Sequence, residues 1–298
     1  MGYINIFISN KSKLSINNNQ LSIETDSKHL YPLEDINSIV IESMECVITS
    51  YALQDLINNN VAVFLCNKQH MPNGVVLPIN NFYRPLKILK KQIEMSKPLK
   101  KQIWQKIVSQ KIFNQSLCLK YCEKKESNRL IELSNSVLSG DASNCEATAA
   151  AIYFKALFGN DFIRHSSCII NAILDYGYSL LRGMIARTLV AYGLNPTMGI
   201  FHKNELNGFN LADDIIEPFR PVVDLLAFEL KDEEQLSSDV KKRIFSITSK
   251  EIEINKQKYS LPYAIEIMVQ SVKRSIEDNK LDIMLPFLLK DGSLHKYE

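Results

Sequence analysis

The pattern of apolar residues changes near residue 80, and this change constrains the fold more than any other feature of the sequence. Before it, short runs alternate between apolar and polar residues, as strands with one buried face do. After it, apolar residues recur every three or four positions, for example at Ile88, Ile103 and Ile107, which is typical of amphipathic helices. We therefore expect an α+β fold, with a small amino-terminal β-rich, β-sandwich-like domain followed by a larger, mostly α-helical domain.

The length of 298 residues favours two domains. We expect a β-rich domain at residues 1–80, a linker at 81–90 and a helical domain at 91–298. Strands are predicted at Tyr3–Ser9, Lys13–Ile16, Gln20–Glu24, Ile39–Ile41, Val61–Cys66 and Gly74–Leu77, and a single helix at Ser50–Asn58 capped by Thr49 or Ser50. Further helices are predicted at residues 91–122, 127–138, 144–158, 166–192, 211–229 and 262–278, with a minor hairpin at 250–260 around Asn255.

The composition is that of an ordinary globular protein, with 46% hydrophobic and 23% charged residues. No apolar run reaches the roughly 18 residues that a membrane span needs, so we expect no membrane partner and a cytoplasmic location. The six cysteines are scattered and are expected to be free thiols. Cys118 and Cys122 lie four apart on a predicted helix, as two zinc ligands can, but no matching second Cys/His pair follows.

Lysines crowd the segment between residues 87 and 129, where acids are few. The net charge of +2 is too small to predict nucleic-acid binding from the total. The lysines of this segment are Lys87, Lys90, Lys91, Lys97, Lys100, Lys101, Lys106, Lys111, Lys120, Lys124 and Lys125. Such a row usually forms a solvated helix face, and clustered lysine also creates a field that attracts phosphate. Both interpretations stay open at this point.

The first candidate for chemistry is Glu146, which lies in the segment SNCEATAAAIYFKALFG. Ser143 stands three residues before it, which is the spacing of a capping box, and that arrangement would give Glu146 a purely structural role. A carboxylate at the start of a helix could equally take part in a metal site. The spacing alone favours the cap.

The second candidate is the polar segment from Thr197 to Asp224. His202 lies in a loop, and Asp213, Asp214 and Glu217 occupy the first turns of a predicted helix capped by Asn210. Acids at that place complement the helix dipole, and a lone loop histidine is usually a surface residue. Together these residues also suit a divalent cation, since carboxylates bind Mg²⁺ or Mn²⁺ and an imidazole shifts the preference toward Mn²⁺. The residues by themselves leave the two interpretations equally open.

Three longer segments change that balance because of a family resemblance. NCEATAAAIYFKALFGNDFIR, NAILDYGYSLLRGMIAR and GIFHKNELNGFNLADDIIEPFRPVVD occur in this order after an amino-terminal strand block. Over nearly its whole length the chain resembles the CRISPR-associated integrase family of spacer acquisition, and the Glu-Pro-Phe-Arg-Pro run resembles its type II branch. The resemblance implies that Glu146, His202 and Glu217 are both catalytic residues and ligands of Mg²⁺ or Mn²⁺. It also implies that Asp213 supports this site without binding the metal.

By the same resemblance, the 3′-hydroxyls of a protospacer attack phosphodiesters of the CRISPR leader and repeat, so double-stranded DNA is the implied substrate. Phosphate contacts would position it without specifying sequence. The candidate DNA-contacting residues are Arg84, Lys87, Arg164, Arg182, Arg187, Lys203 and Arg220. Two of these have another interpretation, since Arg164 could pair with Asp161, and Arg220 with Asp224. Tyr176 and Tyr178 are interpreted as core residues rather than as base-stacking residues.

The resemblance further implies an assembly. Residues 1–80 would form a homodimer interface, and two dimers would join a small ferredoxin-like adaptation partner in a heterohexamer. The type II accessory ring protein and the large RNA-guided nuclease are further implied partners. Two other functions remain in competition: a metal-dependent endonuclease for branched or repair-intermediate DNA, and a non-catalytic DNA-binding scaffold.

Overall fold

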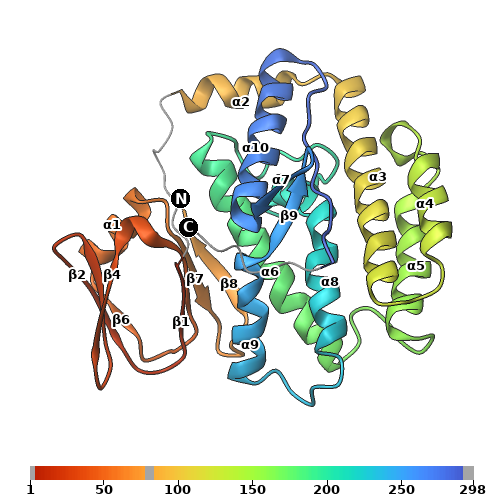
Figure 1. Cartoon of the computed structure of the whole chain (residues 1–298). Coiled ribbons are helices and arrows are strands. Elements are labelled where there is room, and N and C mark those ends of the chain that lie inside the picture. The colour runs from red at the N-terminus through yellow and green to blue at the C-terminus, as the bar shows by residue number, and fades with distance from the viewer. Residues whose placement is uncertain (1–3, 78–83, 291–298) are drawn as a thin grey trace.

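The computed structural model describes residues 4–77 and 84–290, and its amino-terminal part contains two four-stranded sheets (Figure 1). The first sheet has the order β1-β5-β7-β8, in which β1, β5 and β7 run parallel and β8 runs antiparallel. Its strands are β1 Ile4–Ile8, β5 Ile36–Ile41, β7 Ala62–Cys66 and β8 Pro72–Val76. The second sheet, in the order β4-β3-β2-β6, comprises β4 Lys28–Pro32, β3 Gln20–Glu24, β2 Lys13–Asn17 and β6 Val47–Ile48. A short 3₁₀ turn, η1 (Leu33–Asp35), joins β4 to β5.

The two sheets enclose a shared apolar core, which confirms the β-sandwich-like prediction. Leu14 and Leu21 from the second sheet and Ile39 from the first are fully buried in one cluster. Helix α1 (Ser50–Asn58) begins as predicted, because the Thr49 hydroxyl accepts a hydrogen bond from the backbone N–H of Ala52 at 3.1 Å. Strand β4 was missed, since its mostly exposed residues show no alternation of apolar and polar side chains and it pairs only with β3.

The other face of the first sheet packs on the helical part of the molecule. Phe64 of β7 belongs to the helical core and meets helix α6 (Ile169–Ala191) at Gly183. A Cβ on Gly183 would lie 2.2 Å from a ring carbon of Phe64, so this close approach needs glycine. The sheet is therefore buried on both faces and joins the two halves.

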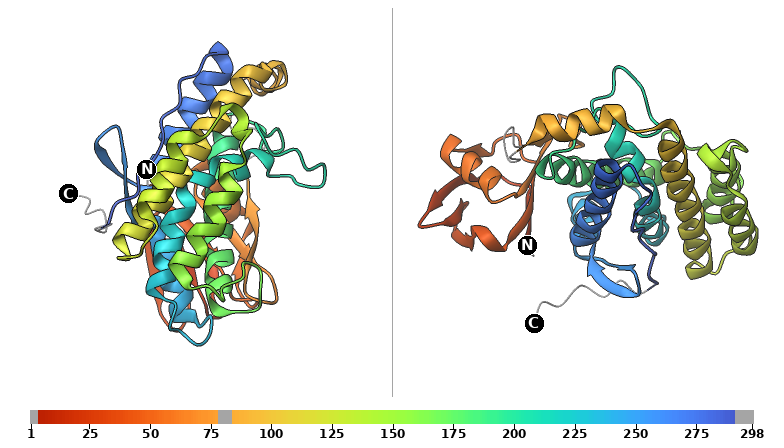
Figure 2. Two further views of the ribbon diagram at one scale, coloured as in Figure 1. Left: turned by 90° about the vertical axis from the view of Figure 1, so that its right-hand side faces the viewer. Right: turned by 90° about the horizontal axis from the view of Figure 1, so that it is seen from above.

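The helical part surrounds α6, as the view from above shows (Figure 2). Its earlier elements are α2 Pro85–Glu94, α3 Lys97–Tyr121, α4 Ser127–Ser136, η2 Ser139–Asp141 and α5 Cys145–Phe158. Its later elements are α7 Asn210–Ile215, η3 Glu217–Phe219, α8 Arg220–Glu229, α9 Ser238–Phe245, η4 Ser246–Ser249 and α10 Leu261–Asp278. The predicted hairpin is confirmed as β9 Glu251–Ile254 and β10 Gln257–Ser260.

Several predicted boundaries were wrong. Helix α2 occupies residues 85–94, which include most of the predicted linker, and residues 81–83 of that linker lie outside the described part. The predicted helix at 91–122 is two helices, because Ser96 caps α3 by accepting a bond from the N–H of Leu99. The predicted helix at 211–229 is broken at η3, and α9 was missed. Tyr3, at which the first strand was predicted to begin, also lies outside the described residues.

Candidate active site

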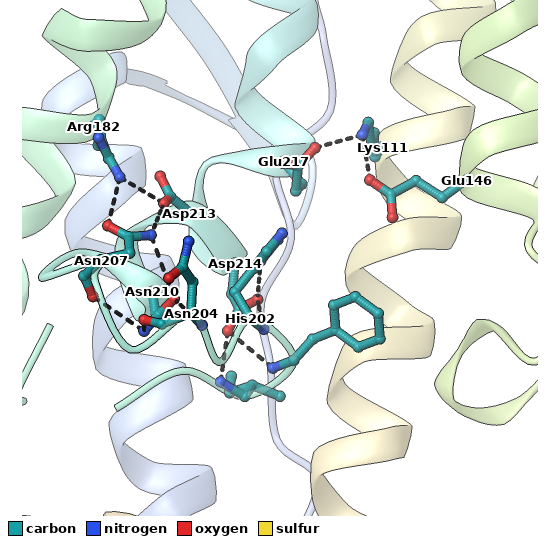
Figure 3. Close-up of polar contacts among 12 residues, drawn as sticks. Lys111, Glu146, Arg182, His202, Asn204, Asn207, Asn210, Asp213, Asp214 and Glu217 are labelled. Carbon is teal, nitrogen blue, oxygen red and sulfur yellow. Dashed lines mark hydrogen bonds and ion pairs between the residues drawn. The ribbon is translucent and has the colours of Figure 1, made fainter. Parts of the chain in front are cut away.

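The two predicted acidic ligands meet at one lysine (Figure 3). Lys111 Nζ lies 2.6 Å from Glu146 Oε1 and 2.5 Å from Glu217 Oε2. Burial by itself would lower the pKa of Lys111, but the Glu217 and Glu146 carboxylates outweigh it and raise this pKa, so the ammonium stays charged. Three elements far apart in sequence, α3, α5 and η3, thus place two carboxylates around a single cation.

Glu217 owes its position to a break in the helix. Pro218 lacks an N–H, so the chain turns as 3₁₀ between α7 and α8. The buried Asn114 side chain, one turn beyond Lys111 on α3, donates to the carbonyl of Pro218 at 2.7 Å. Arg220 Nε donates to Glu217 Oε1 at 2.9 Å. Burial raises the pKa of Glu217, but Arg220 and Lys111 outweigh this effect and lower the pKa to about 2.

Glu146 stands in the first turn of α5, and the capping box predicted for it was wrong. The Asp141 carboxylate accepts the backbone N–H groups of Cys145, at 2.8 Å, and Glu146, at 3.1 Å. Ser143 instead contacts the thiol of Cys145. Because Asp141 satisfies the helix end, the side chain of Glu146 is left for Lys111.

The loop that carries His202 is built around the fully buried Asp214. Its carboxylate accepts the backbone N–H groups of Ile200, Phe201 and His202, at 2.5, 3.0 and 3.1 Å. It also lies 2.7 Å from His202 Nδ1. In the neutral imidazole, this contact with a carboxylate places the proton on Nδ1 and leaves the lone pair of Nε2 for a ligand. Gly199 closes the loop, since a Cβ there would lie 2.2 Å from the His202 carbonyl oxygen.

Asp213 takes a different partner. Arg182 Nη2 binds its carboxylate at 2.7 Å, and the same nitrogen donates to Asn207 at 2.8 Å. Asn210, predicted as a helix cap, is the first residue of α7 and holds the loop by donating to the carbonyls of Thr197, Asn204 and Asn207. The acid that positions His202 is therefore Asp214 rather than Asp213.

The three predicted ligands are brought near one another but are not assembled. Across residues 4–77 and 84–290, no three His, Cys, Asp or Glu side chains form a metal-binding group. The bond to Asp214 raises the pKa of His202 above 6.5, and the Glu217 carboxylate is close enough to add to this rise. Paired carboxylates that already hold a cation, beside an available imidazole nitrogen, fit Mg²⁺ or Mn²⁺ once the ammonium of Lys111 moves away.

A further buried carboxylate, Asp224, lies on α8, two turns beyond Glu217 of η3. It accepts hydrogen bonds from the hydroxyls of Tyr153, at 2.9 Å, and Tyr178. Burial raises its pKa to about 6, and the two tyrosine bonds only partly offset this effect. Its partners show that Tyr178 is a core residue, as predicted, and Tyr176 is also fully buried.

The predicted DNA-contacting residues divide into two groups. Arg84, Lys87 and Lys203 are exposed. The other four hold structure: Arg164 pairs with Asp175 at 2.6 Å, Arg182 with Asp213, and Arg220 with Glu217, while Arg187 is 5% exposed and donates to the carbonyl of Asn60. The partner of Arg164 is Asp175 rather than the expected Asp161. The partner of Arg220 is Glu217 rather than the expected Asp224. Burial removes Arg187 from the DNA-contacting set.

A basic pocket beside His202 escaped the sequence analysis. It encloses about 270 Å³ and is lined by Lys97, Lys100, Lys101, Lys203, Trp104 and Phe201. The rings of Phe201 and Trp104 stack with their centroids 4.2 Å apart. The pKa of Lys100 is lowered, mainly by burial and further by the nearby positive charge of Lys203. The lysine-rich segment was the available signal, but only the fold shows which of its lysines gather beside Phe201 and Lys203.

Two structural expectations remain to be reported. Cys118 and Cys122 are free thiols, and within residues 4–77 and 84–290 they belong to no group of three His, Cys, Asp or Glu side chains that could hold zinc. Among the described helices, none has the length and apolarity that crossing a bilayer requires.

A β-rich half, a helical half and a histidine–carboxylate site together define a class of protein. Sequence comparison identifies the family to which this class corresponds. Residues 6–258 match the family described as "CRISPR associated protein Cas1", and the chain belongs to that family. It is 41% identical, over 97% of both chains, to the protein named CRISPR-associated endonuclease Cas1 of Neisseria meningitidis serogroup C (strain 8013). A protein of the same kind from Saccharolobus solfataricus is 28% identical over 64% of this chain and 63% of that relative. The family resemblance is confirmed.

Solved structures show the same fold. A casposase bound to integration product superposes with a TM-score of 0.76 at 19% identity, covering 100% of this chain and 96% of that one. A Cas1 protein from Thermotoga maritima gives 0.70 at 18% identity, covering 94% and 99%. A Cas6-RT-Cas1–Cas2 complex gives 0.68 at 18% identity, covering 94% of this chain and 36% of that one. At these identities the likeness concerns the fold alone.

Proposed function

We propose that this chain is a metal-dependent DNA integrase of the type II branch, which inserts protospacer DNA into a CRISPR array. In this proposal Glu146, His202 and Glu217 are the catalytic metal ligands. The observation that carries it is the convergence of the Glu146 and Glu217 carboxylates on one cation position beside His202. Two carboxylates and one imidazole that coordinate Mg²⁺ or Mn²⁺ would suit the cleavage and joining of phosphodiesters.

Each side chain has a task in this mechanism. Bound at this site, Mg²⁺ or Mn²⁺ supplies Lewis-acid activation of a 3′-hydroxyl and stabilises charge on the phosphoryl oxygen. Glu217 remains a carboxylate at any physiological pH because its pKa is about 2. Asp214 holds the Nδ1 proton of the neutral His202 ring, so Nε2 is the nitrogen that would bind the metal. Asp213, predicted to support the ligands, acts through Arg182 and the loop instead.

DNA would approach over the basic pocket. Lys203 follows His202 directly, and Lys97, Lys100 and Lys101 extend the positive surface along the start of α3. Arg84 and Lys87 lie on the neighbouring turn and first residues of α2 and are exposed. Lysines in such a row bind phosphates without reading sequence, which suits an enzyme that must accept many protospacers.

The assembly is also part of the proposal. Residues 1–80 would form the homodimer interface, and residues 91–298 would carry the catalysis. A small ferredoxin-like adaptation partner would complete a heterohexamer, and the similar fold found in a Cas6-RT-Cas1–Cas2 complex supports this expectation. The type II accessory ring protein and the RNA-guided nuclease are proposed as further partners, in the cytoplasm.

A second candidate function is endonuclease activity on branched or repair-intermediate DNA. The printed names of the curated relatives, which call them endonucleases, favour this candidate. The same ion and the same residues would serve it, with water in place of the 3′-hydroxyl. The products therefore separate the two functions: joined DNA for the integrase and shortened DNA for the endonuclease.

The deciding experiment is an integration assay with the purified chain and its small partner. The substrates are a supercoiled plasmid with the cognate leader and repeat, and a short duplex with free 3′-hydroxyls, in Mn²⁺ or Mg²⁺. We expect covalent joining that disappears in EDTA and in the His202→Ala variant. Degradation without joining would favour the endonuclease, and full activity in alanine variants of all three ligands would favour the non-catalytic scaffold.

A further inference from the structure

Lys111 occupies the place where the divalent ion of the proposed function would bind. Its side chain is only 9% exposed, and its ammonium is the shared partner of Glu146 and Glu217. Arg220 is the other cation of the cluster and holds the second oxygen of Glu217, Oε1. The four side chains Lys111, Arg220, Glu146 and Glu217 therefore carry two positive and two negative charges.

This balance opposes the entry of a metal. A neutral cluster has little attraction for a divalent cation, and the two oxygens that face each other are already taken by the ammonium. Removing the lysine charge leaves Glu146 and Glu217 with only Arg220, which is a net charge of −1. An ion that binds both carboxylates can do so only after the ammonium has left the space between them.

We propose that Lys111 is an internal counter-cation that holds Glu146 and Glu217 together in the metal-free protein, and that the divalent ion displaces it on binding. This inference rests on the proposed metal site. Lys111 is then a positioning residue, because it acts through the two carboxylates. Its flexible four-carbon stem allows the ammonium to leave while the helix stays in place. Asn114, one turn along α3, keeps that helix attached to Pro218 throughout.

The direct test is Mn²⁺ binding to the full-length, EDTA-treated chain, measured by calorimetry and by the paramagnetic resonance signal of free Mn²⁺. We expect Lys111→Met to tighten Mn²⁺ binding at least about tenfold, because one adjacent like charge disappears. Lys106→Met is the matched control, since Lys106 is exposed on the same helix, and it should bind Mn²⁺ as the wild type does. Unchanged or weaker binding by Lys111→Met would overturn the proposal, because a merely structural lysine gives that result.

A second measurement needs no variant and so holds even where Lys111→Met fails to fold. The wild-type chain is treated briefly with an amine-acylating reagent, with and without Mn²⁺, and acylation at each lysine is read by mass spectrometry. We expect Lys111 to react several-fold faster in Mn²⁺, since its displaced ammonium gains solvent, while Lys106 reacts equally in both. Equal or slower reaction of Lys111 in Mn²⁺ contradicts displacement.

The failure of this inference is distinguishable from the failure of the proposed function. Glu217→Gln should abolish the Mn²⁺ binding of the wild type, because it removes a proposed ligand. If Glu217→Gln binds Mn²⁺ as the wild type does, the metal site itself is wrong and the inference about Lys111 falls with it. If Glu217→Gln abolishes binding but Lys111→Met does not tighten it, only the role of Lys111 is wrong.

Discussion

Glu217 and Asp224 are buried carboxylates only seven residues apart, yet their surroundings shift their pKa values in opposite directions. The pKa of Glu217 falls to about 2, whereas that of Asp224 rises to about 6. Burial disfavours the charged form of both. Glu217 has two cations as partners, Arg220 and Lys111, and these outweigh burial. Asp224 has two tyrosine hydroxyls, which stabilise the carboxylate less than a full positive charge does.

The two pKa shifts distinguish a candidate site residue, Glu217, from a core residue, Asp224. A carboxylate that stays charged beside a cation is prepared to exchange that cation for a metal ion, as we propose for Glu217. A carboxylate that is held by hydroxyls and takes up a proton near neutral pH serves packing, and here it links α5, α6 and α8 through Tyr153 and Tyr178. Burial alone would not have distinguished the two.

The largest expected effect separates the two acids by activity. Glu217→Gln should lower the rate of DNA strand transfer by roughly a thousandfold, because losing a metal ligand removes several kcal/mol of transition-state stabilisation. Asp224→Asn is the matched amide substitution and should keep activity within about tenfold, since Asp224 contacts no proposed ligand. The measurement is the initial rate of joining in the integration assay. Equal losses in the two variants would remove the distinction between site and core.

The next effect concerns the cation beside Glu217. Arg220→Met leaves this buried carboxylate with Lys111 alone, and since Lys111 still balances its charge, we expect the free energy of unfolding to fall by about 2–3 kcal/mol. Chemical denaturation at neutral pH measures this change. Arg243→Met is the control, because the Arg243–Glu233 pair is exposed and should contribute less than about 1 kcal/mol. A loss for Arg220→Met as small as that of the control would show that Glu217 does not depend on its cations.

The smallest effect is a pH dependence assigned to Asp224. Its folded pKa of about 6 lies above the unfolded value of 3.8, so the folded state keeps this proton longer. Stability from this group is therefore greatest at low pH and declines as pH rises through this window. Relative to Asp224→Asn, which cannot ionise, the wild type should lose about 2 kcal/mol of unfolding free energy between about pH 4 and about pH 7.

The control for this titration is Gln54→Ala, since Gln54 is exposed on α1 and its replacement removes no ionisable group. Its difference from the wild type should stay flat over the same pH range. If the difference in unfolding free energy between the wild type and Asp224→Asn also stayed constant with pH, the pKa of Asp224 would not be raised in the folded protein. The contrast between Asp224 and Glu217 would then be wrong for Asp224.

Local signals predicted most elements because they depend on short stretches of chain. The Thr49 cap of α1 and the hairpin at Asn255 were found in this way, since both are set by neighbouring residues. The same reasoning failed where a different residue, either nearby or far along the chain, made the deciding contact. The spacing of Ser143 and Glu146 matched a capping box, but Asp141 supplies the cap. The continuous helical pattern at 211–229 hid the break at Pro218, which Asn114 of α3 stabilises.

The sequence by itself determined the fold class, the family and the identity of Glu146, His202 and Glu217 as candidate ligands. The fold class follows from the periodicity of apolar residues, whereas the family and the candidate ligands follow from the resemblance of three sequence motifs to that family. Only the tertiary structure decided that Lys111 stands between the two glutamates, that Asp214 rather than Asp213 holds His202, and that Arg187 is buried. The reason is physical: burial and charge pairing act over a few ångströms in space, between residues as far apart in the chain as Lys111 and Glu217.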